Sequence, residues 1–130
     1  MKTLQPPGWP RPRGYSNGMS ASGRLIVTAG VVGWDEREFF QSPHLVDQFE
    51  QALKNVLAIL AEDGAGPEHV VRMTCYVTDI EAYRRCTDHL GPVWKQVMGD
   101  HYPAMALVAV KSLVEPAAEI EIEATAVVPE

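Results

Sequence analysis

Near the C-terminus, three glutamates alternate with two isoleucines over residues 119–123. This period of two predicts a strand that carries the isoleucines on one face and the carboxylates on the other. Three carboxylates on one strand face repel one another unless cations, hydrogen bonds or protons accommodate them. The pattern therefore indicates either a solvated sheet face or a working site, where a carboxylate can act as a general acid or base.

Other segments must position this strand. Apolar residues that recur at intervals of three and four predict one amphipathic helix over His44–Glu62. A second helix is predicted from Asp79 or Ile80 to about Met98, with a bend or step at Gly91-Pro92. Further strands are predicted in four segments, of which the first two are expected to pair as a hairpin: residues 19–22, 24–28, 70–77 and 104–110.

The order of these elements, β-β-α-β-α-β-β, predicts an α+β fold. We expect a two-layer sandwich with one mixed β-sheet and two helices on one face, so that the other face meets solvent or another subunit. Residues 107–110, Leu-Val-Ala-Val, are apolar on both faces of their strand, which is typical of a strand buried on both sides and favours an oligomer. Four prolines make residues 1–13 an extended arm that precedes a single domain over residues 14–130.

Composition narrows the class of protein further. A net charge of −6 disfavours a nucleic-acid partner, because phosphate binding requires a basic face. Cys75 and Cys86 match no zinc motif and are expected to be free, reduced thiols. The scattered histidines indicate no metal site, and no nucleotide-binding motif or other cofactor signature is present. Without a long apolar segment, we expect a soluble cytoplasmic protein with no membrane partner.

Several motifs resemble the Rid family, also called YjgF. Pro103-Ala104, the strand after it and Ile-Glu-Ile-Glu-Ala at 120–124 resemble the closing signature of the family. Gly14-Tyr15-Ser16 and Leu-Ile-Val-Thr-Ala-Gly at 25–30 resemble its opening signature. The resemblance extends from about Gly14 to Val128. It implies a chorismate-mutase-like fold, a homotrimer, and small-molecule sites in the clefts between subunits.

The same resemblance assigns roles to individual residues. Glu121 occupies the position of the glutamate that handles the proton when water attacks a C=N carbon, and Tyr15 that of a tyrosine whose hydroxyl approaches the substrate. Ala29 and Gly30 match a two-residue motif of the family, after the second predicted strand, whose backbone N–H groups approach the ligand. From the residues alone, Glu121 could instead be part of a solvated strand face, Tyr15 an edge aromatic and Gly30 a turn glycine.

One position departs from the family. Deaminating members have an arginine two residues after the proline, where this chain has Met105. Methionine cannot clamp a carboxylate, so Met105 and Leu107 predict a substrate less acidic than a 2-imino acid. Arg13, on the arm, could restore the cation or could simply be exposed to solvent.

Two functions remain open at this point. One is a deaminase that hydrolyses a reactive enamine or imine, and the alternative is a non-catalytic trimer that binds a small metabolite in the same clefts. RNA cleavage, an activity attached to some family members, is opposed by the acidic net charge.

Overall fold

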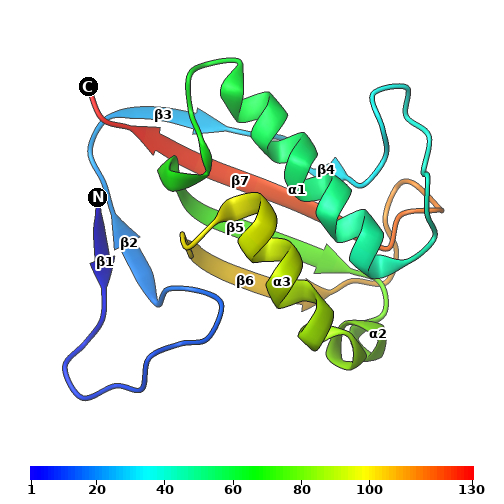
Figure 1. Ribbon diagram of the computed structural model, residues 1–130, viewed down its shortest axis with the longest axis horizontal. Coiled ribbons are helices and arrows are strands. Elements are labelled where there is room, and N and C mark those ends of the chain that lie inside the picture. Colours follow the sequence, from blue (N-terminus) through cyan, green and yellow to red (C-terminus); the bar gives the residue numbers. More distant parts are fainter.

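The computed structural model describes residues 1–130 and has two layers, a sheet and the helices that cover one of its faces (Figure 1). The strands of this sheet follow the order β3-β7-β5-β6, and the short β4 also pairs with β7. β5 and β6 are parallel, whereas β7 is antiparallel to all its neighbours. This confirms the mixed sheet and the α+β class. The strand bounds are β3 (Arg24–Val27), β4 (Val31–Val32), β5 (Val70–Val77), β6 (Ala104–Ala109) and β7 (Ile120–Val128).

The structure confirms the first helix, which the spacing of apolar residues predicted. α1 (Leu45–Ala61) buries one stripe of side chains against the sheet, formed by Phe49, Leu53, Val56 and Leu60. Ser42 stabilises the N-terminus of this helix, because the Ser42 hydroxyl accepts a hydrogen bond from the His44 N–H and donates one to the Asp47 carboxylate. The buried Gln48 side chain ties α1 to the segment before β7, where it bonds the Ala117 carbonyl and the Glu119 N–H.

The second predicted helix is two helices, α2 (Ile80–Arg85) and α3 (Thr87–Met98). The predicted step at Gly91-Pro92 is wrong, because the break lies at Cys86, whose φ of −114° and ψ of 13° leave the helical region. Pro92 lies inside α3, past its first turn, and removes one backbone hydrogen bond without ending the helix. The chain therefore has three α-helices, α1, α2 and α3, rather than the two expected, and they lie on one side of the sheet (Figure 1).

The predicted hairpin of residues 19–22 and 24–28 is also wrong. β2 (Gly18–Ser20) pairs with β1 (Lys2–Leu4), while β3 pairs with β7. Gly23, with a φ of 147°, lets the chain pass close to the end of β7 instead of turning back: a Cβ at this position would lie 2.1 Å from the Val128 carbonyl oxygen. β1 and β2 form a separate ribbon beside the main body (Figure 1), so part of the proline-rich arm is a strand.

The two faces of the sheet differ in what covers them. On the helix side, β7 buries alternate residues, Ile120, Ile122, Ala124 and Ala126. On the other side, no helix covers β3 or β6, and apolar side chains are exposed: Leu25 by 66%, Val27 by 63% and Val108 by 44%. Leu25 and Val27 are neighbours on this face of β3, whereas Val108 lies on β6 at the opposite edge of the sheet. Large exposed apolar side chains on an uncovered sheet face are typical of an interaction surface.

Candidate functional site

The Gly-Tyr-Ser motif lies at the open edge of β6. The Ser16 N–H donates a hydrogen bond to the Pro103 carbonyl at 3.0 Å, and the Ser16 hydroxyl donates to the Tyr102 carbonyl. Ser16 also forms a bridge with Ala104, in parallel orientation. These bonds place Arg13 and Tyr15 beside the strand, although about 90 residues separate the two segments in sequence.

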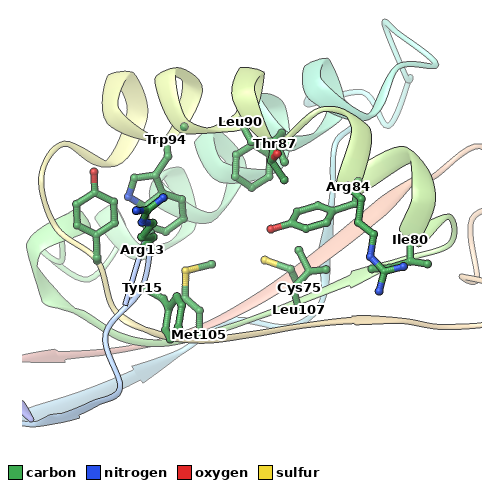
Figure 2. A pocket seen from close by; sticks show the side chains of 15 residues that line it. Arg13, Tyr15, Cys75, Ile80, Arg84, Thr87, Leu90, Trp94, Met105 and Leu107 are labelled. Carbon is green, nitrogen blue, oxygen red and sulfur yellow. The ribbon is translucent and has the colours of Figure 1, made fainter. Parts of the chain in front are cut away.

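A cavity of about 760 Å³ lies between the arm, β6 and the helices α2 and α3 (Figure 2). It brings together four of the residues predicted for the site, namely Arg13, Tyr15, Met105 and Leu107. The other lining residues were not predicted as substrate-binding or catalytic residues. They are Gly14, Phe49, Cys75, Ile80, Tyr83, Arg84, Thr87, Leu90, Gly91, Trp94 and Tyr102.

Aromatic rings form one wall of this cavity. Trp94 stacks between Phe49 and Tyr102, with ring centroids 6.4 and 6.1 Å apart. The Trp94 indole N–H donates to the His101 carbonyl at 3.1 Å, which fixes the orientation of the ring. This wall can accept a flat or bulky apolar group with little rearrangement.

The cavity holds one thiol, which is not activated. Cys75 is fully buried, and its burial raises the pKa of the thiol to about 12. Burial also raises the pKa of the neighbouring Tyr83 hydroxyl. Both groups stay protonated near neutral pH, so thiolate chemistry is excluded at Cys75.

Glu121 lies on the uncovered face, against Gly30. A Cβ at Gly30 would lie 2.5 Å from Glu121 Oε2, so the close approach of this loop to the carboxylate requires glycine. The Thr28 hydroxyl fixes the loop, because it accepts from the Ala124 N–H and donates to the Ala29 carbonyl. Gly30 is thus brought against Glu121.

Hydroxyl groups accommodate the other two glutamates. The Tyr76 hydroxyl donates to Glu123 at 2.7 Å, and this bond is the main reason why the pKa of Tyr76 is raised. The Thr78 hydroxyl donates to Glu119 at 3.4 Å. Glu121, which lies opposite Tyr76 in the register, accepts no side-chain hydrogen bond and is the carboxylate left free to act on a ligand.

The predicted residues divide between the two faces of the sheet. Cys75 pairs with both Ile122 and Leu107, on the helix side, whereas Tyr76 pairs with both Glu121 and Val108, on the uncovered side. Glu121, Ala29 and Gly30 therefore form one group, and the residues of the cavity form another. One subunit does not bring the two groups together.

Residues 10–128 match the family described as Endoribonuclease L-PSP. A RutC family protein from Aquifex aeolicus is 34% identical over 128 residues, which cover 98% of this chain and 99% of the relative. The chain belongs to the Rid (YjgF) family. Among solved structures, the Rid-family protein YyfB from Yersinia pestis is 28% identical, with a TM-score of 0.82 and 98% of each chain covered. Rv2704 from Mycobacterium tuberculosis, of the YjgF/YER057c/UK114 family, is 34% identical with a TM-score of 0.67, covering 89% and 88% of the two chains.

In this Rid-family chain, the cations of the cavity come from outside β6. Met105 points from β6 into the cavity, while Arg13 and Arg84 reach it from the arm and from α2 (Figure 2). No group of three or more His, Cys, Asp or Glu residues is placed to hold a metal ion. None of the helices combines the length and the apolar character that a bilayer span requires.

Proposed function

We propose that this Rid-family protein is a deaminase that hydrolyses a reactive enamine or imine with an apolar side chain, at sites between the subunits of a ring-shaped homotrimer. The observation that carries the proposal is the division of the predicted site residues between two parts of one sheet. Glu121 and Gly30 lie toward the β3 and β4 edge, and the cavity lies along β6, the opposite edge (Figure 1).

A head-to-tail contact unites the two groups. If the β6 edge of one subunit meets the β3 and β4 edge of the next, the cavity of the first faces Glu121 of the second. Repetition of such a contact closes into a ring when the rotation permits. The uncovered faces then point inward and bury the exposed Leu25, Val27 and Val108, whose exposure in a single subunit supports this arrangement.

The reaction follows from the groups that meet in this cleft. The apolar cavity holds the side chain of an imine, which an enamine reaches by moving one proton from nitrogen to carbon. Glu121 takes a proton from a water molecule as the water oxygen bonds to the C=N carbon, and it passes that proton to the nitrogen, which becomes an amine. Glu121 then takes the proton of the new hydroxyl group and delivers it to the nitrogen as the C–N bond breaks, so that ammonia and a carbonyl compound leave. The hydroxyl of Tyr15 can orient the water or the substrate.

A second function is favoured by one observation. Met105 offers no charge at the position where deaminating relatives have an arginine, so the same clefts could bind a small metabolite without turnover. Catalysis that depends on Glu121 separates the two functions. RNA cleavage is not proposed, because the chain carries a net charge of −6 and its cavity is mainly apolar.

Ammonia release tests the deaminase. The substrates are freshly generated 2-imino acids and neutral imines with small or aromatic side chains, and the proteins are wild type, Glu121→Ala and Glu119→Ala. We expect Glu121→Ala to lose on the order of 100-fold or more in rate, the usual effect of removing a general acid or base. Glu119→Ala is the matched control on the same strand face and keeps its activity. If no substrate is accelerated while an arginine-bearing relative is active in parallel, the deaminase proposal fails and metabolite binding is tested instead.

A further inference from the structure

Two neighbouring glutamates of β7 lean in opposite directions across the uncovered face of the sheet. Glu121 Oε2 lies on the β4 side, where a Cβ at Gly30 would approach it to 2.5 Å. Glu123 leans to the β5 side, where its Oε1 accepts the hydrogen bond of the Tyr76 hydroxyl at 2.7 Å. Because β4 and β5 pair with opposite edges of β7 (Figure 1), the two carboxylates point away from each other.

The register between β5 and β7 places Tyr76 beside both glutamates. The Tyr76 backbone lies directly opposite Glu121, yet its hydroxyl reaches Glu123, the next residue on the same face of β7. The Tyr76 side chain therefore extends from the position of Glu121 to that of Glu123, along the β5 side of both. Loss of the hydroxyl alone leaves Glu123 without a side-chain donor, since Tyr76 supplies the one that it has.

Within the subunit, no ion pair neutralises Glu121 or Glu123. Arg72 shares their face of the sheet but lies beyond Glu123, opposite Thr125. The residues of this face on the other strands are uncharged: Leu25 and Val27 on β3, Val32 on β4, and Ala104, Ala106 and Val108 on β6. Across the proposed interface, the titratable groups are those that line the cavity of the next subunit: Arg13, Tyr15, Cys75, Tyr83, Arg84 and Tyr102. Two carboxylates about 7 Å apart along a strand repel each other, and they share a proton when they are free to approach.

We propose that Tyr76 is a positioning residue for the reaction: its hydroxyl holds Glu123 over β5, so that Glu121 acts on the substrate as a lone carboxylate. This inference rests on the proposed function and adds to it a residue outside the cavity. Without the hydroxyl, Glu123 relaxes toward Glu121 and the two carboxylates share a proton. Glu121 is then protonated for part of the time and cannot accept a proton from water. The cost of losing the hydroxyl therefore depends on the charge of Glu123.

Ammonia release tests this dependence in wild type, Tyr76→Phe, Glu123→Gln and the double variant that combines the two substitutions. Tyr76→Phe keeps the ring and should lose about tenfold in kcat, a part of the 100-fold or more that a positioned base contributes. Its KM should not change, because Tyr76 does not line the cavity. Glu123→Gln should stay within about twofold of wild type, and the double variant should recover that rate, a coupling that a merely structural role of Tyr76 does not produce. Thr78→Val is the matched control: it removes the longer bond to Glu119, of 3.4 Å, and should keep the wild-type rate.

A second measurement does not depend on turnover. The carboxyl carbons of the glutamates are labelled with carbon-13, and the Glu121 resonance, assigned by its loss in Glu121→Gln, is followed by NMR as the pH changes. In wild type this resonance should titrate in a single step. In Tyr76→Phe a further step, shared with the Glu123 resonance, should appear, and in the double variant the single step should return.

Two results would overturn the inference: the double variant is as slow as Tyr76→Phe, or the Glu121 resonance titrates identically in wild type and in Tyr76→Phe. A changed titration in Tyr76→Phe, without turnover by any of the proteins, defeats the deaminase proposal and supports the positioning of the carboxylates by Tyr76. Equal turnover by wild type and Tyr76→Phe defeats the positioning role and supports the deaminase.

Discussion

Substitution of Gly30 by alanine should displace the carboxylate of Glu121 without unfolding the protein. The new Cβ would lie 2.5 Å from Oε2 and 2.8 Å from Cδ of Glu121, whereas ordinary contact begins at 3.4 Å. The carboxylate must therefore retreat by about 1 Å, and a misplacement of that size costs on the order of 100-fold in rate. The clashing atoms belong to a side chain that can rotate, and alanine also restricts the unfolded chain. We therefore expect the free energy of unfolding to change by less than about 1 kcal/mol.

The assay compares kcat/KM for ammonia release and the midpoint of urea unfolding in wild type, Gly30→Ala and Gly18→Ala. Gly18→Ala is the matched control, because its Cβ meets only the Leu4 side chain, at 3.3 Å, in the ribbon of β1 and β2. We expect Gly30→Ala to lose rate and Gly18→Ala to retain it, with both variants folded. Full activity of Gly30→Ala would refute the argument that the position of Glu121 controls the chemistry.

Two further predictions concern stability and assembly. Burial raises the pKa of Cys75 from 9.0 to about 12, so the folded state holds this proton more tightly. Its stabilising contribution is complete below pH 9 and is lost as the pH rises toward about 12, at about 1.4 kcal/mol per pH unit. Between pH 8 and pH 10.5, the free energy of unfolding measured with urea should fall less in Cys75→Ala than in wild type. Equal decreases in the two proteins would contradict this prediction. Val27→Glu should reduce the molar mass in light scattering to that of one chain, whereas Val114→Glu, at a loop residue that is 91% exposed, should not. Identical masses for the two variants would exclude the uncovered face as the interface.

Periodicity predicted the regular elements of the fold but not their turns. The three- and four-residue spacing located α1, and alternation located β7, because each pattern reflects the face that the element buries, whereas β5 was located by its run of β-favouring residues. The pairing of β2 depended instead on Gly23. This glycine is typical of a turn, but here it lets the backbone pass close to the end of β7. The helix break was assigned to Gly91-Pro92, the strongest local signal, yet α3 continues through Pro92 and the chain breaks at Cys86.

Only those residues of the candidate site that lie in the family's sequence motifs could be predicted from the sequence. Tyr15, Met105 and Leu107 were expected together and do share a cavity. Trp94 and Arg84 were missed because helical spacing marks an apolar face without indicating that part of it lines an open cavity. Alternation could show that Glu121 and Ile122 lie on opposite faces of β7. Whether Met105 lies on the same face of the sheet as Glu121 depends on the register between β5, β6 and β7. That register is a tertiary property, and it places Met105 and Glu121 on opposite faces.

The division of the site between two subunits predicts complementation. A variant without the carboxylate, Glu121→Ala, keeps an intact cavity, and a variant altered in the cavity, Tyr15→Ala, keeps its carboxylate. In a head-to-tail ring, a site is restored wherever the cavity of the first variant faces Glu121 of the second. Random mixing of equal amounts restores about a quarter of the sites. The two variants are unfolded together, refolded and assayed for ammonia release, with each refolded alone as the control. A site contained within one subunit would remain inactive in every mixture, and such a result would exclude the intersubunit cleft.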